Sequence, residues 1–176
     1  MGTERRPATE AEARALASGV RLRIIRLCLD GALTNKEIAQ RLGANPATIL
    51  HHVRTLVATG FLTPQPERRG TRGAREVPYL STGKSWTINV HDSAVGHANQ
   101  AVLEAFSDEL RLVGLDSEGV HLSRLGLRLD PAEWAELMKR FDELLDEYAR
   151  RPPTAGGRPY SIFLALYEDV SRDAPR

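Results

Sequence analysis

Two short amphipathic segments separated by a glycine constrain the fold of this chain more than any other feature. In the first, Thr34 and Glu37 have the spacing of a capping box, in which each side chain satisfies the other's exposed backbone N–H at the start of a helix. The apolar positions that follow form a single stripe: Ile38, Ala39 and Leu42. Gly43 then ends the segment, which predicts a short helix followed by a tight turn.

A second helix is predicted to begin directly after this glycine. Asn45 suits the N-cap position, and Pro46 suits the first helical position, where its missing N–H costs nothing. The helix runs to Gly60. Its inward side is apolar and comprises Ile49, Val53 and Leu56. Two short helices joined by a glycine turn predict a helix-turn-helix.

The outward side of the second helix is short, polar and cationic, as a helix that enters the major groove of DNA must be. Arg54 can bind a guanine edge or a phosphate, and an apolar side chain such as Leu50 or Ala47 can contact a thymine methyl. The candidate DNA-reading residues are Pro46, Ala47, Thr48, Leu50, His51, Arg54 and Thr55. Residues around the turn are expected to support them: Thr34, Asn35, Lys36 and Asn45. The alternative is a solvated helix face.

Two extended segments follow, and a basic, glycine-containing stretch separates them. Pro64, Pro66 and Pro78 each remove a donor from a strand ladder, which predicts that these strands lie at a sheet edge. Gly70 and Gly73 suit the tip of a hairpin. The phosphate-binding candidates of this predicted wing are Arg68, Arg69, Thr71, Arg72 and Arg75. A loop that contacts the DNA phosphate backbone needs positive charge to bind the phosphates and glycines that allow close approach.

The distribution of charge supports this interpretation, although the total does not. The chain has 176 residues and a net charge of +1, which by itself argues against a nucleic-acid partner. Residues 1–90, however, hold 14 Lys and Arg against 7 Asp and Glu, a net charge of +7, whereas residues 91–176 hold 10 against 16, a net charge of −6. The two halves are therefore expected to have different roles.

The first half resembles the winged helix-turn-helix core of ArsR-type bacterial transcription regulators over about residues 12–90. The matching pieces are RLRIIRLC, LTNKEIAQRLG, NPATILHHVRTL and Gly60-Phe61-Leu62. The resemblance implies a DNA-binding regulator, usually a dimer and often a repressor. It also implies that His52 is a partly buried structural residue. Members of the family commonly have serine at the position of Leu50, so the base preference does not carry over.

These observations favour a sequence-specific transcription regulator, a homodimeric repressor on a pseudo-palindromic site of double-stranded DNA. The half-sites would lie about 34–36 Å apart. A winged helix that binds another protein without reading DNA is the alternative. An enzyme is disfavoured because no nucleophile–base pair is visible, and Gly83-Lys84-Ser85 lacks the preceding glycine of a phosphate-binding loop. No cofactor and no membrane partner are expected, and the expected location is the cytoplasm, at the nucleoid when DNA is bound.

A metal site is not expected either. Cys28, the one cysteine, lies in an apolar helix and is expected in the core. His91, Asp92 and His97 are the nearest set of potential ligands, but their spacing does not place the histidines on one helical face. They are expected to be ordinary polar residues at a domain junction.

The fold class expected for the whole chain is α+β, with a winged helix-turn-helix DNA-binding domain over residues 1–90 and a small α/β region over residues 91–176. This acidic second region is expected to serve dimerisation and to be the place where an effector could bind. In the second part, residues 120–129 alternate like a strand, residues 131–148 have helical periodicity, and residues 160–167 have the pattern of a buried strand, which together predict a βαβ unit. The apolar stripe from Trp134 to Tyr148 is interpreted as core. A dimer interface or a cavity for a small apolar effector are the alternatives.

Overall fold

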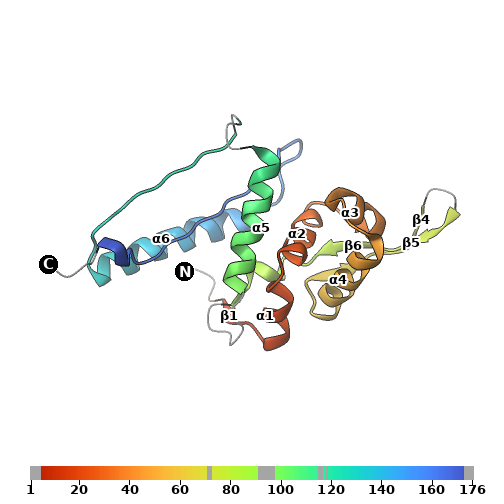
Figure 1. Cartoon of the computed structure of the whole chain (residues 1–176), viewed down its shortest axis with the longest axis horizontal. Coiled ribbons are helices and arrows are strands. Elements are labelled where there is room, and N and C mark those ends of the chain that lie inside the picture. The colour runs from red at the N-terminus through yellow and green to blue at the C-terminus, as the bar shows by residue number, and fades with distance from the viewer. Residues whose placement is uncertain (1–4, 71–72, 91–97, 115–116, 118, 173–176) are drawn as a thin grey trace. The chain divides into compact units, whose positions relative to one another are not determined.

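The computed structural model describes residues 5–70, 73–90, 98–114, 117 and 119–172 (Figure 1). These residues form two compact units, one ending at Val113 and the other beginning at Gly114. The division therefore lies at residue 113 rather than at the predicted residue 90. Helix α5 (Ala98–Val113) accounts for the difference, because it packs against α1 (Glu10–Leu16) and α2 (Gly19–Leu27).

The predicted helix-turn-helix is present in the first unit as α3 (Asn35–Leu42) and α4 (Pro46–Ala58). The capping box is confirmed, since the Thr34 hydroxyl accepts from the Glu37 N–H over 3.2 Å and the Glu37 carboxylate accepts from the Thr34 N–H over 2.7 Å. Gly43 ends α3 with a φ of +60°, a left-handed conformation that glycine adopts without strain. Local capping chemistry thus fixes where both helices begin and how the turn between them is made.

A three-stranded antiparallel sheet adjoins this pair, with β6 (Pro78–Ser81) between β2 (Leu33–Thr34) and β3 (Leu62–Pro64). The prediction that both proline-bearing segments lie at a sheet edge is wrong for β6. Pro78 is tolerated in the central strand because it is the first residue of that strand. The short strand β2, which covers its other side, has no sequence signal of its own because one of its two residues is the N-cap of α3.

The wing is a separate two-stranded sheet formed by β4 (Arg68–Arg69) and β5 (Arg75–Glu76), and it projects from the helical part of the first unit (Figure 1). Gly73, at its tip, has a φ of +77°. A second small sheet pairs β1 (Arg6–Pro7) with β7 (Ile88–Asn89) in parallel, after a single 3-10 turn, η2 (Lys84–Trp86). The predicted hairpin is confirmed, whereas β1 and β7 carried no sequence signal.

One hydrophobic core holds α1 to α4 and the sheet together. Its largest side chains are almost completely buried: Phe61, Ile24, Ile38, Ile49, Leu56, Leu62, Val53 and Cys28. Burial raises the pKa of the Cys28 thiol to about 11, so this cysteine is a protonated core residue, as predicted. Helix α2 ends at Leu27, with Cys28 as its C-cap.

Helix α5 lies close against α2 because its inner face is made of alanines. Ala98, Ala101 and Ala105 are all buried, and a Cβ placed on Gly19 of α2 would lie 3.6 Å from the backbone N of Ala105. An ion pair of 3.0 Å between Arg26 Nε and a carboxylate oxygen of Glu109 adds a polar link between the same helices. The first unit therefore extends the helix-turn-helix by a tightly packed helix that sequence analysis had assigned to the second half.

The second unit contains α6 (Pro131–Ala149), which begins with a capping box between Asp130 and Glu133, and a 3-10 turn, η3 (Val170–Arg172). The predicted helix is confirmed, but the predicted βαβ unit is wrong for the described residues, since neither 120–129 nor 160–167 forms a strand. Alternation favours an extended backbone, yet a strand exists only when a neighbouring strand completes the ladder. None of the described helices has the length and apolar character that crossing a bilayer requires.

Candidate nucleic-acid interface

Helix α4 has the two-sided character that the sequence predicted. Ile49, Val53 and Leu56 are buried against the core, and the predicted reading residues lie on the other side. Five of these are exposed: Pro46, Ala47, Thr48, His51 and Arg54. The remaining two, Leu50 and Thr55, are half-buried at the margins of this face. The face is short, polar and cationic over the first three turns of the helix, which suits contact with base edges in a groove.

Two residues of α4 are more restricted than the rest. The Thr55 hydroxyl donates to the carbonyl of His51 over 3.1 Å, so it offers a partner only acceptor capacity. His52 is half-buried, and burial lowers its pKa, with smaller contributions from Arg21 and His51. These features agree with a structural role for His52, which the resemblance to the family implied.

The residues around the turn mostly stabilise the motif itself. Asn35 Nδ2 donates to the Pro46 carbonyl over 2.9 Å and so joins the start of α3 to the start of α4. Asn45 Oδ1 accepts from the Ala47 N–H over 2.8 Å, and Thr34 is buried with only 3% of its surface exposed. Lys36, by contrast, is exposed. Of the four predicted support residues, Lys36 therefore has a charged group directed to solvent and available to a phosphate.

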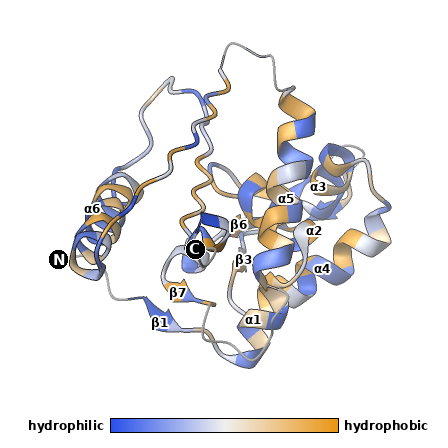
Figure 2. Cartoon of the chain, turned by 60° about the vertical axis from the view of Figure 1, so that its left-hand side comes forward, coloured by the Kyte–Doolittle hydropathy of each residue, from blue (hydrophilic) through white to orange (hydrophobic). Residues whose placement is uncertain are grey.

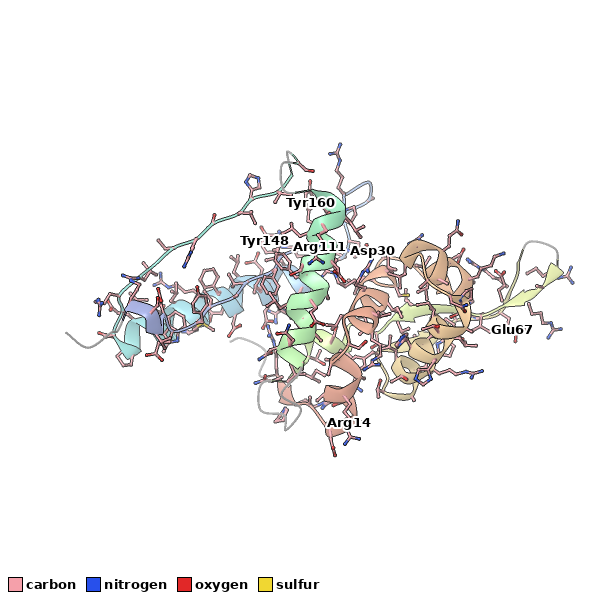
Figure 3. The ribbon with its side chains drawn as sticks, viewed as in Figure 1. Arg14, Asp30, Glu67, Arg111, Tyr148 and Tyr160 are labelled. Carbon is pink, nitrogen blue, oxygen red and sulfur yellow. The ribbon has the colours of Figure 1, made fainter. Side chains whose placement is uncertain are left out.

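The three described arginines of the wing are not equivalent. Arg68 Nη2 donates to both carboxylate oxygens of Glu37 over 2.7 Å. Arg75 Nη1 lies 3.5 Å from a carboxylate oxygen of Glu67, a residue that Figure 3 labels. Arg69 is exposed and forms no ion pair with any residue that the structure describes. The predicted contacts Thr71 and Arg72 lie outside the described residues. Arg69 is therefore the described wing cation with the least internal competition for a phosphate.

Glu37 connects the wing to the helix-turn-helix. Hydrogen bonds from the backbone and hydroxyl of Thr34, together with the Arg68 guanidinium, lower the pKa of this carboxyl and keep it ionised at neutral pH. The sequence pattern predicted a capping role for Glu37 and phosphate binding for Arg68. The capping role is confirmed, whereas the ion pair between residues 31 positions apart left no sequence signal.

A second ionic cluster that sequence analysis missed supports the other end of the unit. The buried Glu12 carboxylate accepts from Arg6 over 2.6 and 2.9 Å, pairs with Lys84 Nζ at 2.7 Å, and caps α1 through the Thr9 N–H. Lys84 also donates to the Thr59 carbonyl. Gly83-Lys84-Ser85 is thus a turn whose lysine is bound internally, as expected from the missing glycine of a phosphate loop. The potential ligands His91, Asp92 and His97 lie outside the described residues.

A protein-family model for a helix-turn-helix domain matches residues 16–65, which contain α2, α3, α4 and β3. No curated protein sequence matches the chain. Among solved structures, reduced HlyU from Vibrio cholerae is similar with 22% identity and a TM-score of 0.35, covering 58% of this chain and 84% of HlyU. The homodimeric winged helix-turn-helix DNA-binding domain Mb0332 from Mycobacterium bovis has 24% identity and a TM-score of 0.34, covering 61% of this chain and 82% of that chain.

ZitR from Lactococcus lactis in complex with DNA has 17% identity and a TM-score of 0.32, covering 74% of each chain. The fold and the matched residues define a winged helix-turn-helix protein, a class in which many members bind DNA through the second helix of the motif. The matched residues 16–65 support the helix-turn-helix domain, and the ArsR type remains the interpretation of the helix sequences.

Proposed function

We propose that this protein is a sequence-specific DNA-binding transcription regulator in which α4 enters the major groove and the wing contacts the phosphate backbone. The observation that carries the proposal is the outward face of α4, where Thr48, His51 and Arg54 are exposed beside a projecting basic hairpin. Arg54 supplies a base or phosphate contact, and Arg69 supplies a phosphate contact from the wing. Arg72 is assigned to the same role on its sequence position.

The proposal includes a homodimer that forms through α5. Besides its buried alanine face, α5 has a second apolar stripe, which includes Val102, Leu103, Phe106, Leu110 and Val113. Leu103 and Val113 are 46% and 57% exposed, which is costly for a helix that faces only water. Pairing of two such stripes would bring two copies of α4 to one pseudo-palindromic site, and occupation of a promoter would repress transcription.

Selection of bound fragments from sheared genomic DNA, followed by a gel shift across a salt series, tests this function. We expect retardation at low salt, a recurrent inverted-repeat sequence among the selected fragments, and a linear fall of log affinity with log salt concentration. Replacing both Arg69 and Arg72 with alanine should weaken binding to every sequence alike and flatten the salt slope. Absence of any retardation at low salt would instead favour a winged helix that binds another protein.

The effector of such a regulator is proposed to bind in the second unit. A surface cavity of about 250 Å³ that is open to solvent is lined by Leu127, Leu129 and Leu137, with Glu133, Glu136 and Arg140 around them. Its apolar lining suits a small apolar molecule. Retardation of the selected DNA fragment in the presence of candidate apolar compounds would reveal such an effector by a change in affinity.

A further inference from the structure

The second unit has almost no core of its own. Among its described residues, only Asp146 is buried, and every residue from 121 to 130 is exposed. A polypeptide of this length is stable only when it buries apolar side chains, because the entropy lost on ordering the chain must be offset. The described part of the unit is therefore incomplete, because its apolar side chains need a further surface to pack against.

Helix α6 supplies one half of that surface. Its apolar residues recur at helical spacing and form one stripe: Trp134, Leu137, Met138, Phe141, Leu144, Leu145 and Tyr148. Figure 2 shows hydrophobic, orange stretches of ribbon alternating with hydrophilic ones along α6. All of them are half-buried or exposed, with Leu144 at 51% and Tyr148 at 57%. Ion pairs at i,i+4 border this stripe, such as Glu136 with Arg140 and Glu147 with Arg151. The stripe itself carries no charge, so its partner surface must also be apolar.

The segment before α6 supplies the other half. Leu125, Leu127 and Leu129 lie on one side of an extended backbone and are 79%, 48% and 36% exposed. From residue 121 to residue 126, the backbone makes no hydrogen bond to another described residue, and the Leu127 carbonyl accepts only a long one from Arg172, at 3.4 Å. This segment has the side-chain alternation of a strand, and its backbone N–H and C=O groups are available to pair with a neighbouring strand.

The exposed apolar surface has the size of a protein–protein interface. Six large apolar side chains of the α6 stripe and the Leu125–Leu129 face are at least 36% exposed, and the other four members of the stripe are half-buried. At roughly 100 Å² for each exposed side chain and roughly 50 Å² for each half-buried one, they offer on the order of 800 Å². A typical monomer has no apolar patch above about 600 Å², whereas a stable interface covers about 800 Å² of each partner. A small ligand in the cavity of about 250 Å³ at Leu127, Leu129 and Leu137 cannot cover this surface.

We propose that the second unit is completed by the same unit of a second copy of this chain, which buries the α6 stripe and the Leu125–Leu129 face between the two copies. Residues 114–176 hold 12 acidic and 9 basic residues, so their net charge of −3 opposes such an approach only weakly. The inference rests on the proposed dimer, in which pairing of α5 holds two second units at high effective concentration. A two-fold axis perpendicular to the extended segment and close to it would also pair this segment with its own copy in antiparallel orientation.

The fluorescence emission of Trp134 measures burial of this interface in the absence of DNA. The result of this experiment is therefore independent of the proposed DNA binding. In the full chain carrying Trp86→Phe, Trp134 is the only tryptophan, and its emission should lie at shorter wavelength in the dimer than in the monomer. Sedimentation over the same concentrations separates dimer formation itself from burial of this face. Leu125→Asp should shift the emission to longer wavelength and raise the dissociation constant about tenfold or more.

The matched control is Lys139→Gln, which makes the same change of one charge unit on the polar face of α6 and should leave emission and dissociation constant unchanged. Leu144→Asp, on the stripe itself, should act like Leu125→Asp. The proposal is overturned if the chain is monomeric at all concentrations, or if it dimerises while Trp134 emission is the same in both aspartate variants and in the control. The first outcome would leave a different partner to cover the face, and the second would leave α5 as the whole interface.

Discussion

Arg68 in the wing donates from Nη2 to both carboxylate oxygens of Glu37, over 2.7 Å each, and so ties the wing to the first turn of α3. The same carboxylate accepts from the Thr34 N–H and caps the helix. One glutamate thus fixes both the start of α3 and the base of the wing. As a consequence, Arg68 and the neighbouring Arg69 are expected to act differently, although sequence analysis treated them alike.

Replacing Arg69 with alanine should weaken DNA binding without changing stability. The side chain is exposed and has no ion-pair partner among the described residues, so its loss removes a phosphate contact and nothing else. The salt slope of log affinity should fall by about 1, equally for specific and non-specific DNA. Arg68→Ala should also lower the free energy of unfolding, by up to about 1 kcal/mol, because it breaks the link to Glu37.

Arg111→Ala provides the control for these two variants. Arg111 is 73% exposed on α5 and lies far from the wing in Figure 3, so its loss changes the net charge equally without removing a wing contact. Anisotropy titrations across a salt series, with urea unfolding of each variant, measure both effects. Equal salt slopes for Arg69→Ala and Arg111→Ala would show that Arg69 does not contact a phosphate.

Asn35 and Lys36 are adjacent, but replacing the first should change folding stability, whereas replacing the second should change DNA binding. Asn35 joins the two helices of the motif through the Pro46 carbonyl, so Asn35→Ala should cost about 1 kcal/mol of folding free energy. Lys36 is exposed, so Lys36→Ala should leave stability unchanged and lower DNA affinity through the lost charge. Chemical unfolding and anisotropy on the same preparations measure the two quantities. The reverse pattern would mean that the bond between Asn35 and Pro46 does not brace the motif.

The features predicted correctly from sequence are those that depend on neighbouring residues. The Thr34–Glu37 box, the Asn45-Pro46 start of α4 and the helical periodicity of residues 131–148 all rest on relations within four positions, so their patterns are visible in the chain. The Glu37–Arg68 pair depends on folding that brings distant residues together, and no local pattern encodes it. Strand 120–129 was predicted from alternation alone, which specifies an extended backbone but not its neighbour.

Stability should fall with acid in a way that Glu12 controls. Hydrogen bonds from Arg6, then from Lys84 and Thr9, lower the pKa of this buried carboxyl below that of the unfolded chain. A lowered pKa in the folded state gives a stabilisation that is fully present above the ordinary glutamate pKa, about 4.3, and is lost as the pH falls below it. Glu12→Gln should therefore lower the free energy of unfolding at pH 7 by about 2 kcal/mol, with a smaller difference near pH 3.

Glu10→Gln is the control for this pH dependence. Glu10 lies in the same helix, but its side chain is 67% exposed, and its pairing with Arg14 is between two solvated groups. Urea unfolding between about pH 3 and pH 7 should give Glu10→Gln and the unchanged chain nearly parallel curves. A Glu12→Gln curve that runs parallel to both would show that the Glu12 cluster does not stabilise the fold.

Enlarging the alanine face of α5 should displace that helix from α2. Ala105 is 5% exposed, and the backbone of Gly19 lies so near that a Cβ there would be 3.6 Å from the Ala105 N. Ala105→Leu should therefore cost about 1–3 kcal/mol through overpacking, whereas Gly19→Ala makes only ordinary van der Waals contact and should be tolerated. In the proposed dimer, a displaced α5 also changes the distance between the two α4 helices. DNA affinity should then fall more for an inverted repeat than for a single half-site.

Gln100→Leu separates overpacking from the addition of an apolar side chain to α5. Gln100 is exposed on the same helix, so the enlarged residue has room and α5 keeps its place against α2. Thermal and urea unfolding compare the two leucine variants, and anisotropy on a full site and on a half-site measures the geometric effect. If Ala105→Leu were as stable as Gln100→Leu and kept the same preference for the full site, the close contact of α5 with α2 would not set the geometry of the dimer.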